Sequence, residues 1–138
     1  MCDESVPAGD WTLHDEDGFL GLVGPVLERR DGDRIVLGFR ADAKHRNKRG
    51  VVQGGMLVTL ADRAMGVTAS TALNDQPVAT VQLDTHFVSA GRIGEFIVAD
   101  VDIVRVTRSL AFIDARLLAD ERLLMTARGI WKILTNPG

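Results

Sequence analysis

An aspartate inside a long apolar stretch is the residue of this sequence whose setting most suggests chemistry. The stretch runs from Gly54 to Ala72, contains no proline and repeats its apolar side chains at helical spacing. Burying an ionised carboxylate is costly unless it is paired. A carboxylate in a partly dry cleft can attack an electrophile or deprotonate water. Asp62 is therefore a candidate catalytic residue, and a salt bridge to Arg63 or exposure on a narrow polar strip is the structural alternative.

The start of the same helix offers hydrogen-bond donors. A helix N-terminus has unpaired N–H groups and the positive end of the helix dipole. Gly54 permits close approach because it has no Cβ, although Gly54 and Gly55 could simply let the helix pack closely against a strand. Asn47 adds a side-chain amide shortly before the helix, in a place where asparagine also caps turns. Donors of this kind, fixed around a developing oxyanion, typically supply about 10²–10³ in rate apiece.

The composition excludes several functional classes. The single cysteine, Cys2, rules out an intramolecular disulfide and a metal site built on several thiolates, and the three histidines have no ligand spacing, so we expect no metal and no redox cofactor. The net charge of −3 argues against nucleic-acid binding. No apolar run of about 18 residues predicts a membrane span, and no signal-peptide pattern opens the chain. We expect a cytoplasmic protein.

The elements that position these residues form an α+β pattern. We expect a flexible N-terminal arm over residues 1–16 and one domain over residues 17–138. Two strands, Val26 to Arg30 and Arg34 to Ala41, precede the helix, and about four long antiparallel strands follow Pro77. A curved sheet of about five to six strands wrapped around one helix leaves a face or an edge to meet a second subunit.

The strand after Pro77 alternates between two faces. Val81, Leu83, Thr85 and Phe87 point to one face. Simple alternation puts Thr80 on the other face, together with Gln82, Asp84 and His86. Threonine is at home in strands without any catalytic role.

Three segments together resemble a known family. They are His45-Arg-Asn47, Gly50-Val-Val-Gln53-Gly54-Gly55, and Leu60-Ala-Asp62 with Met65-Gly66. They are similar to the hotdog-fold acyl-CoA thioesterases of the phenylacetic-acid-degradation (PaaI-like) type, whose pattern is roughly H-x-N-x-x-G-x-x-H-G-G followed by a helix carrying L-x-D. The segment from Val78 to Ala90 resembles the strand after the helix in that family, and the likeness covers about residues 18 to 134.

The resemblance implies an architecture and an activity. It implies a curved antiparallel sheet around the helix, and dimers whose sheets join edge to edge and often pair into tetramers. It implies active sites at the dimer interface and hydrolysis of an acyl-CoA thioester to the free acid and CoA. Carried over to this sequence, Asn47 and the Gly54 N–H bind the thioester oxygen, Asp62 of the other subunit is nucleophile or general base, and Thr80 helps to place water. Gln53 stands where the family usually has histidine, and an amide can donate a hydrogen bond but cannot titrate near neutral pH.

Further residues are candidates for substrate binding. Gln53, Gly55, Met56 and Met65 could line the acyl site, although packing is the preferred explanation for both methionines. Lys48, Arg49 and Arg92 could meet the phosphates of CoA, although a solvated loop explains them too.

Three rival functions remain on the same fold. A hydratase usually carries a histidine about five residues after its aspartate, and Val67 occupies that position here. A non-catalytic acyl-CoA binder or sensor remains an alternative because histidine is absent at position 53. The third is a structural subunit whose cleft is vestigial.

Overall fold

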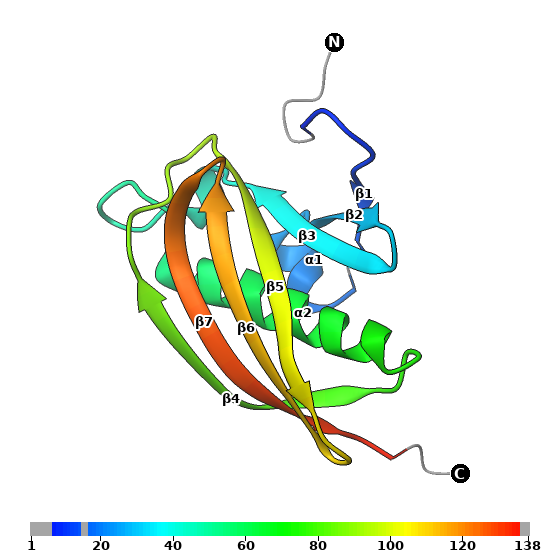
Figure 1. Ribbon diagram of the computed structural model, residues 1–138. Helices are drawn as coiled ribbons and strands as arrows, with labels where there is room; N and C mark the ends of the chain where they lie inside the picture. Colours follow the sequence, from blue (N-terminus) through cyan, green and yellow to red (C-terminus); the bar gives the residue numbers. More distant parts are fainter. Residues whose placement is uncertain (1–6, 15–16, 136–138) are drawn as a thin grey trace.

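The computed structural model describes residues 7–14 and 17–135, and in this part of the chain one long helix lies across a 7-stranded antiparallel sheet (Figure 1). The strands lie side by side in the order β1-β2-β3-β5-β6-β7-β4. No helix among the described residues is long and apolar enough to cross a membrane. In chain order the elements are β1 (Thr12–Leu13), α1 (Phe19–Val23), β2 (Leu27–Asp31), β3 (Arg34–Arg40), a 3-10 turn (Ala43–His45), α2 (Gly54–Ala72), β4 (Val78–Phe87), β5 (Phe96–Val106), β6 (Leu110–Ala119) and β7 (Arg122–Ile133).

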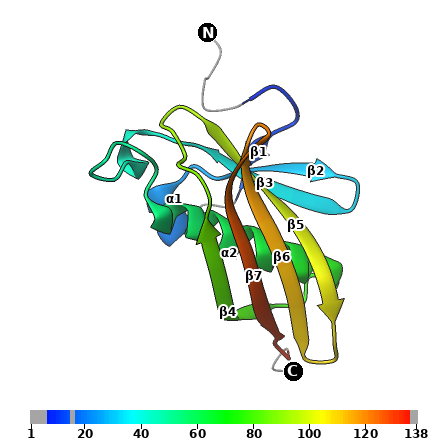
Figure 2. The same ribbon diagram turned by 60° about the vertical axis from the view of Figure 1, so that its left-hand side comes forward.

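The α+β prediction is confirmed, and so are the bounds of the long helix. The sheet curves around α2, as Figure 2 shows from the side. The side chains that α2 buries recur every three to four residues, which is why the apolar stripe predicted the helix. They are Met56, Leu57, Leu60, Ala61, Ala64, Met65 and Ala69. Asp62 is one residue beyond this stripe and is partly exposed.

The N-terminal segment adds a strand that the sequence did not predict. Residues 1–6 and 15–16 of the expected flexible arm lie outside the described residues. Within the described part, Thr12 and Leu13 pair with Glu28 and Leu27 of β2, and this two-residue strand brings the sheet to seven strands. The Trp11 ring packs edge-on against Phe96, with ring centroids 4.9 Å apart.

A β-bulge in β4 overturns the predicted alternation of that strand. Thr80 pairs with Trp131 and Gln82 with the next β7 residue along, Ile130, so Val81 has no partner opposite it. The extra residue shifts the alternation by one position. Thr80 therefore lies opposite the buried Trp131, on the same face as Leu83, whose partner is Gly129, and not with Gln82 as simple alternation required. The bulge turns Thr80 toward α2.

Gly129 of β7 allows β4 and the Trp131 ring to pack closely together. A Cβ built on Gly129 would lie 2.5 Å from the Trp131 ring and 2.7 Å from the backbone oxygen of Gln82. Real Cβ contacts are almost never this short, and the Gln82 oxygen belongs to the paired strand β4. The absence of a side chain at Gly129 therefore permits the close approach of β4 and Trp131.

We predict that Gly129→Ala lowers the free energy of unfolding by about 1–3 kcal/mol, the usual cost of overpacking a tight site. Urea unfolding followed by circular dichroism measures the change. Gly55→Ala is the matched control, because its Cβ would meet only the Gln53 side chain at 3.9 Å and alanine favours a helix. Equal stability of Gly129→Ala and the parent protein would contradict this account of the β4–β7 contact.

Candidate active site

Asp62 and Thr80 form a hydrogen-bonded pair between the helix and the edge strand. The Thr80 hydroxyl donates to Asp62 Oδ1 at 2.7 Å. No described arginine, lysine or histidine lies within ion-pair distance of Asp62, although Arg63 is its neighbour in the chain. The structural alternative of a salt bridge is thus absent from the described residues. Asp62 keeps its second carboxylate oxygen available toward solvent.

Two adjoining hollows open at this pair. One of about 460 Å³ extends along α2 past Gly66 and Ser70 toward Trp131. The other, of about 400 Å³, lies on the side of Phe19 and Leu83. Asp62, Arg63 and Thr80 line both hollows. A substrate held against Asp62 therefore has room on either side of the carboxylate.

The first turn of α2 presents unused donors. The N–H groups of Met56 and Leu57 donate to the Gln53 carbonyl at 2.9 and 3.4 Å. The N–H groups of Gly54 and Gly55 precede these and, in the described structure, have no acceptor. The Gln53 side chain is exposed and makes no capping hydrogen bond. The N–H groups of Gly54 and Gly55 can therefore donate to an anionic oxygen, and binding of the thioester oxygen by Gly54 stays a prediction.

Asn47 both shapes the loop before α2 and retains a donor. Its Oδ1 accepts hydrogen bonds from the N–H groups of Arg49, at 2.9 Å, and Val51, at 3.2 Å. This is the turn-capping role that we weighed as the alternative. Because the oxygen is held by the loop, the side-chain amide group keeps a fixed direction, and within the described residues it has no acceptor.

The fold brings the predicted CoA-binding cations to one end of the molecule. Val51 forms an isolated bridge with Arg92, so the loop carrying Lys48 and Arg49 lies beside Arg92. All three cations are exposed. The Arg92 N–H donates to Glu95 Oε1 at 2.7 Å. Together these residues form a basic patch close to the start of α2.

Glu95 anchors the segment that holds Arg92. Burial acts to raise the pKa of the Glu95 carboxyl, but hydrogen bonds from Arg122 and from the Arg92 N–H, with the charges of both arginines, outweigh it and lower that pKa. Because the folded-state pKa is the lower one, this contribution to stability is present above the unfolded-state pKa and is lost as the pH falls through the folded-state value. At neutral pH the anchor is ionised.

Two predicted substrate-binding residues and two histidines do not border the hollows at Asp62. Met56 and Met65 are 6% and 0% exposed, belong to the hydrophobic core and line neither hollow at Asp62. His45 is buried, and its Nδ1 accepts from the Asp42 N–H at 2.9 Å. His86 stands on the far side of the sheet.

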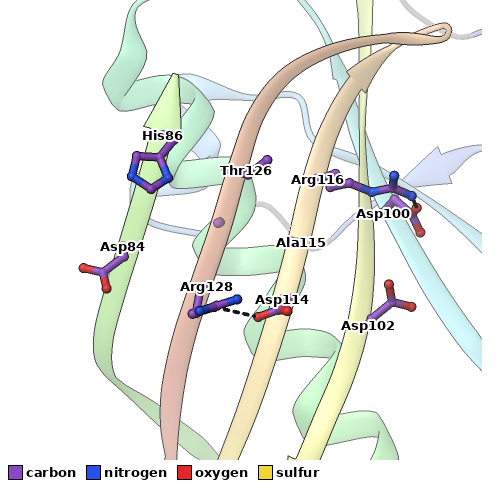
Figure 3. A pocket seen from close by; sticks show the side chains of 10 residues that line it. Asp84, His86, Asp100, Asp102, Asp114, Ala115, Arg116, Thr126 and Arg128 are labelled. Carbon is purple, nitrogen blue, oxygen red and sulfur yellow. Dashed lines mark hydrogen bonds and ion pairs between the residues drawn. The ribbon is translucent and has the colours of Figure 1, made fainter. Parts of the chain in front are cut away.

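The far side of the sheet carries another hollow, which has a different character. Figure 3 shows its side chains standing on the strands with α2 behind the sheet. It measures about 480 Å³, and its charges are largely paired: Arg116 Nη2 lies 2.8 Å from Asp100 Oδ2, and Arg128 Nε lies 3.5 Å from Asp114 Oδ1. It contains neither a helix N-terminus nor the Asp62–Thr80 pair. The candidate active site is therefore on the helix side.

The sequence analysis did not assign three residues beside Asp62 to the site. Trp131 and the buried His14 line the larger hollow, and Arg63 lines both. The Arg63 Nε–H donates to His14 Nε2 at 2.9 Å, across a separation of 49 residues. No motif or spacing in the sequence links two residues so far apart, and only the pairing of β1 with β2 brings them together.

An antiparallel sheet curved around one long central helix is the hotdog fold, and solved structures confirm it. The structure of zebrafish thioesterase superfamily member 2 matches with a TM-score of 0.78 at 24% identity, covering 87% of this chain and 89% of that one. The phenylacetic acid degradation protein PaaI of Thermus thermophilus matches with a TM-score of 0.75 at 20% identity, covering 84% and 98%.

The chain belongs to the thioesterase superfamily, whose family model matches residues 49–126. A Pseudomonas aeruginosa protein named as a candidate esterase, PA0474, is 34% identical over 131 residues, which are 94% of this chain and 98% of the relative. Acyl-coenzyme A thioesterase 13 of Mus musculus is 26% identical over 80 residues, covering 58% of this chain and 57% of the relative. This chain is accordingly a thioester hydrolase in the general sense of its family.

We predict that Thr80→Val lowers kcat for thioester hydrolysis by about 10–100-fold, because a hydrogen bond to a charged group is worth ~1.5–3 kcal/mol. Release of thiol, followed with a thiol reagent, measures kcat. Thr68→Val is the matched control, since the Thr68 hydroxyl donates only to the Ala64 carbonyl within α2, at 2.8 Å. Equal loss in both variants would deny Thr80 a specific role.

Proposed function

We propose that this protein hydrolyses acyl-CoA thioesters to the free acid and CoA, without metal or redox cofactor, at a site shared by two protomers. The observation that carries the proposal is the state of Asp62. This carboxylate lies beside the buried stripe of α2, is partly exposed, is oriented by Thr80, has no described cation as a partner and borders two hollows.

The sharing of the site follows from a distance along α2. Asp62 comes eight residues after Gly54 in the same helix, which is about 12 Å along the axis. Two groups so far apart cannot both reach one thioester carbonyl. A two-fold axis that brings the Asp62 of one protomer to the Gly54 of its partner supplies both groups to each carbonyl.

The edge strand β4 is where such a partner fits. It is ten residues long and pairs with β7 on one side, while no described strand pairs with its other side. Val81, Phe87 and Val88 are 59%, 57% and 56% exposed there. Long apolar edge strands are normally covered, because they pair with other chains. Pairing two copies of β4 would cover this edge and set two α2 helices side by side.

The proposed reaction uses charge development on the thioester oxygen. The Gly54 N–H of one protomer and the Asn47 amide of the same protomer donate to that oxygen as it becomes negative. Asp62 of the partner either attacks the carbonyl carbon, forming an anhydride that water then opens, or removes a proton from an attacking water molecule. In both routes a carbon–oxygen bond forms, the carbon–sulfur bond breaks and the thiolate of CoA takes up a proton from solvent.

The basic patch supports CoA as the leaving thiol. Lys48, Arg49 and Arg92 are exposed cations with no described carboxylate pairing their side chains. Arginine and lysine side chains are the usual ligands of phosphate groups. The patch adjoins the start of α2. A CoA ester whose phosphates bind there can therefore place its thioester at the Gly54 N–H.

A second function is favoured by one residue. Gln53 occupies the position where related thioesterases usually have histidine, and its side chain makes no hydrogen bond in the described structure. A protein that binds acyl-CoA without hydrolysing it would tolerate this exchange. Tight binding of acyl-CoA with no release of thiol would support that function over hydrolysis.

We predict that Asp62→Asn lowers the turnover of acyl-CoA by at least about 10²-fold, since the amide can neither attack nor remove a proton at neutral pH. The amide still accepts the Thr80 hydrogen bond, so the thermal unfolding midpoint should stay close to that of the parent. Asp102→Asn on the far side of the sheet is the control and should leave turnover unchanged. An unchanged rate for Asp62→Asn would remove this residue from the mechanism.

We predict that two inactive variants restore activity when they are co-expressed. Asn47→Asp keeps the oxygen that holds the loop but replaces the donating amide, and Asp62→Asn removes the carboxylate. In a shared two-fold site each mixed dimer has one intact site, so random pairing should recover about a quarter of the parent activity. Recovery near zero, with mixed dimers verified by mass spectrometry, would show that each protomer carries a complete site.

A further inference from the structure

A chain of polar side chains lies directly beside Asp62 and has no part in the reaction as proposed so far. His14 follows β1, Glu28 is on β2 and Arg63 is on α2. His14 Nδ1 lies 2.9 Å from Glu28 Oε1, and the Arg63 Nε–H donates to His14 Nε2 at 2.9 Å. The His14 side chain is 7% exposed, so this arrangement is built into the body of the protein.

The hydrogen bonds determine the proton on His14. An arginine Nε–H is always a donor, so His14 Nε2 must accept. The ring proton therefore resides on Nδ1 and is donated to Glu28. In this arrangement His14 is neutral, and the negative charge of Glu28 reaches Arg63 only through the ring. The neutral His14 ring therefore positions Arg63, and no described carboxylate neutralises the charge of its guanidinium.

The two terminal nitrogens of Arg63 remain available. The Nε–H is its one described hydrogen bond, and no described carboxylate lies within ion-pair distance of its guanidinium. Asp75 also lines the larger hollow, but α2 continues nine residues past Arg63, about 14 Å, before the turn that carries Asp75. A fixed guanidinium with its fork free is the arrangement that binds carboxylates and phosphates in two-pronged fashion.

We propose that Arg63 binds a carboxylate at the acyl end of the substrate, so that the preferred substrates are CoA half-thioesters of short dicarboxylic acids. This inference rests on the proposed function, because it takes the thioester carbonyl to lie at Asp62. Arg63 is the next residue in the chain and borders the same two hollows. The anion that it binds must therefore lie a few bonds from the carbonyl.

The geometry distinguishes this anion from the phosphates of CoA. The pantetheine arm holds those phosphates far from the thioester, and the basic patch of Lys48, Arg49 and Arg92 offers them a separate site near the start of α2. The carboxylate at the end of a short acyl chain lies much closer to the thioester than the CoA phosphates do. Arg63 then determines specificity, and His14 and Glu28 are positioning residues.

Binding of two non-hydrolysable CoA thioethers tests the inference. Their acyl-mimicking chains have equal length, and one ends in a carboxylate while the other ends in a methyl group. Isothermal titration calorimetry gives Kd for each. We expect the parent protein to bind the carboxylate analogue about tenfold or more tightly than the methyl analogue, as for a charge-assisted pair. Arg63→Gln should abolish this preference, and Arg116→Gln on the far side of the sheet should keep it.

The positioning role has its own readout. His14→Gln keeps an acceptor for Arg63 and a donor for Glu28, whereas His14→Leu keeps neither. We expect His14→Leu to lose most of the preference for the carboxylate analogue and His14→Gln to retain more of it, with the Kd of the methyl analogue nearly constant. If His14→Leu and His14→Gln gave the same ratio of the two Kd values, the role of His14 would be packing alone.

Two outcomes overturn the inference. They are a parent protein without preference and an Arg63→Gln variant that keeps the preference. If that variant also binds both analogues more weakly by the same factor, the result would assign Arg63 to a phosphate of CoA. Because the analogues require no turnover, absence of hydrolysis with natural acyl-CoA would count against the proposed function while leaving this comparison of binding intact.

Discussion

The hydrogen bond from Thr80 to Asp62 depends on an irregularity in the sheet, and the arrangement of the candidate site depends on that bond. Without the bulge at Val81, Thr80 would face away from α2. The carboxylate would then lie in the apolar helix with no described partner, which is an unfavourable position for an ionised group. A cation in place of Thr80 would form an ion pair with the carboxylate and would neutralise its charge. A neutral hydroxyl orients one oxygen and leaves the other reactive.

The same edge of the molecule is the basis of the proposal that two protomers share one site. The curved sheet covers the buried stripe of α2, but Asp62 and the apolar side chains of β4 remain open to solvent. The N–H donors at Gly54 are about 12 Å away along the same helix. Phe87 lies against Gly54, where an added Cβ would approach its ring to 3.1 Å, so the exposed edge strand and the donors belong to one surface. A copy docked on that surface covers the apolar edge and joins donors to acid.

Much of this arrangement could be predicted from the sequence, because its signals are local. The period of the apolar side chains gave α2 with both ends correct, and the Asp62 carboxylate stood out because it interrupts that pattern. The bulge could not be predicted, since an extra residue in a strand leaves no mark in an otherwise alternating segment. The contact between His14 and Arg63 was equally hidden, because it joins residues 49 apart through a two-residue strand. A contact between two single polar residues far apart in the chain leaves no periodic pattern in the sequence.

The start of α2 shows how a site can keep its geometry while one side chain changes. The carbonyl of Gln53 accepts from the N–H groups of Met56 and Leu57, and its own N–H donates to the His45 carbonyl at 2.7 Å. These contacts are made by the backbone, so they set the direction of the first turn whatever side chain position 53 carries. The side chain itself is exposed and free of hydrogen bonds within the described structure. Exchange of histidine for glutamine therefore removes a titratable group but leaves the Gly54 N–H in place, which is why the hydrolase proposal does not require a histidine here.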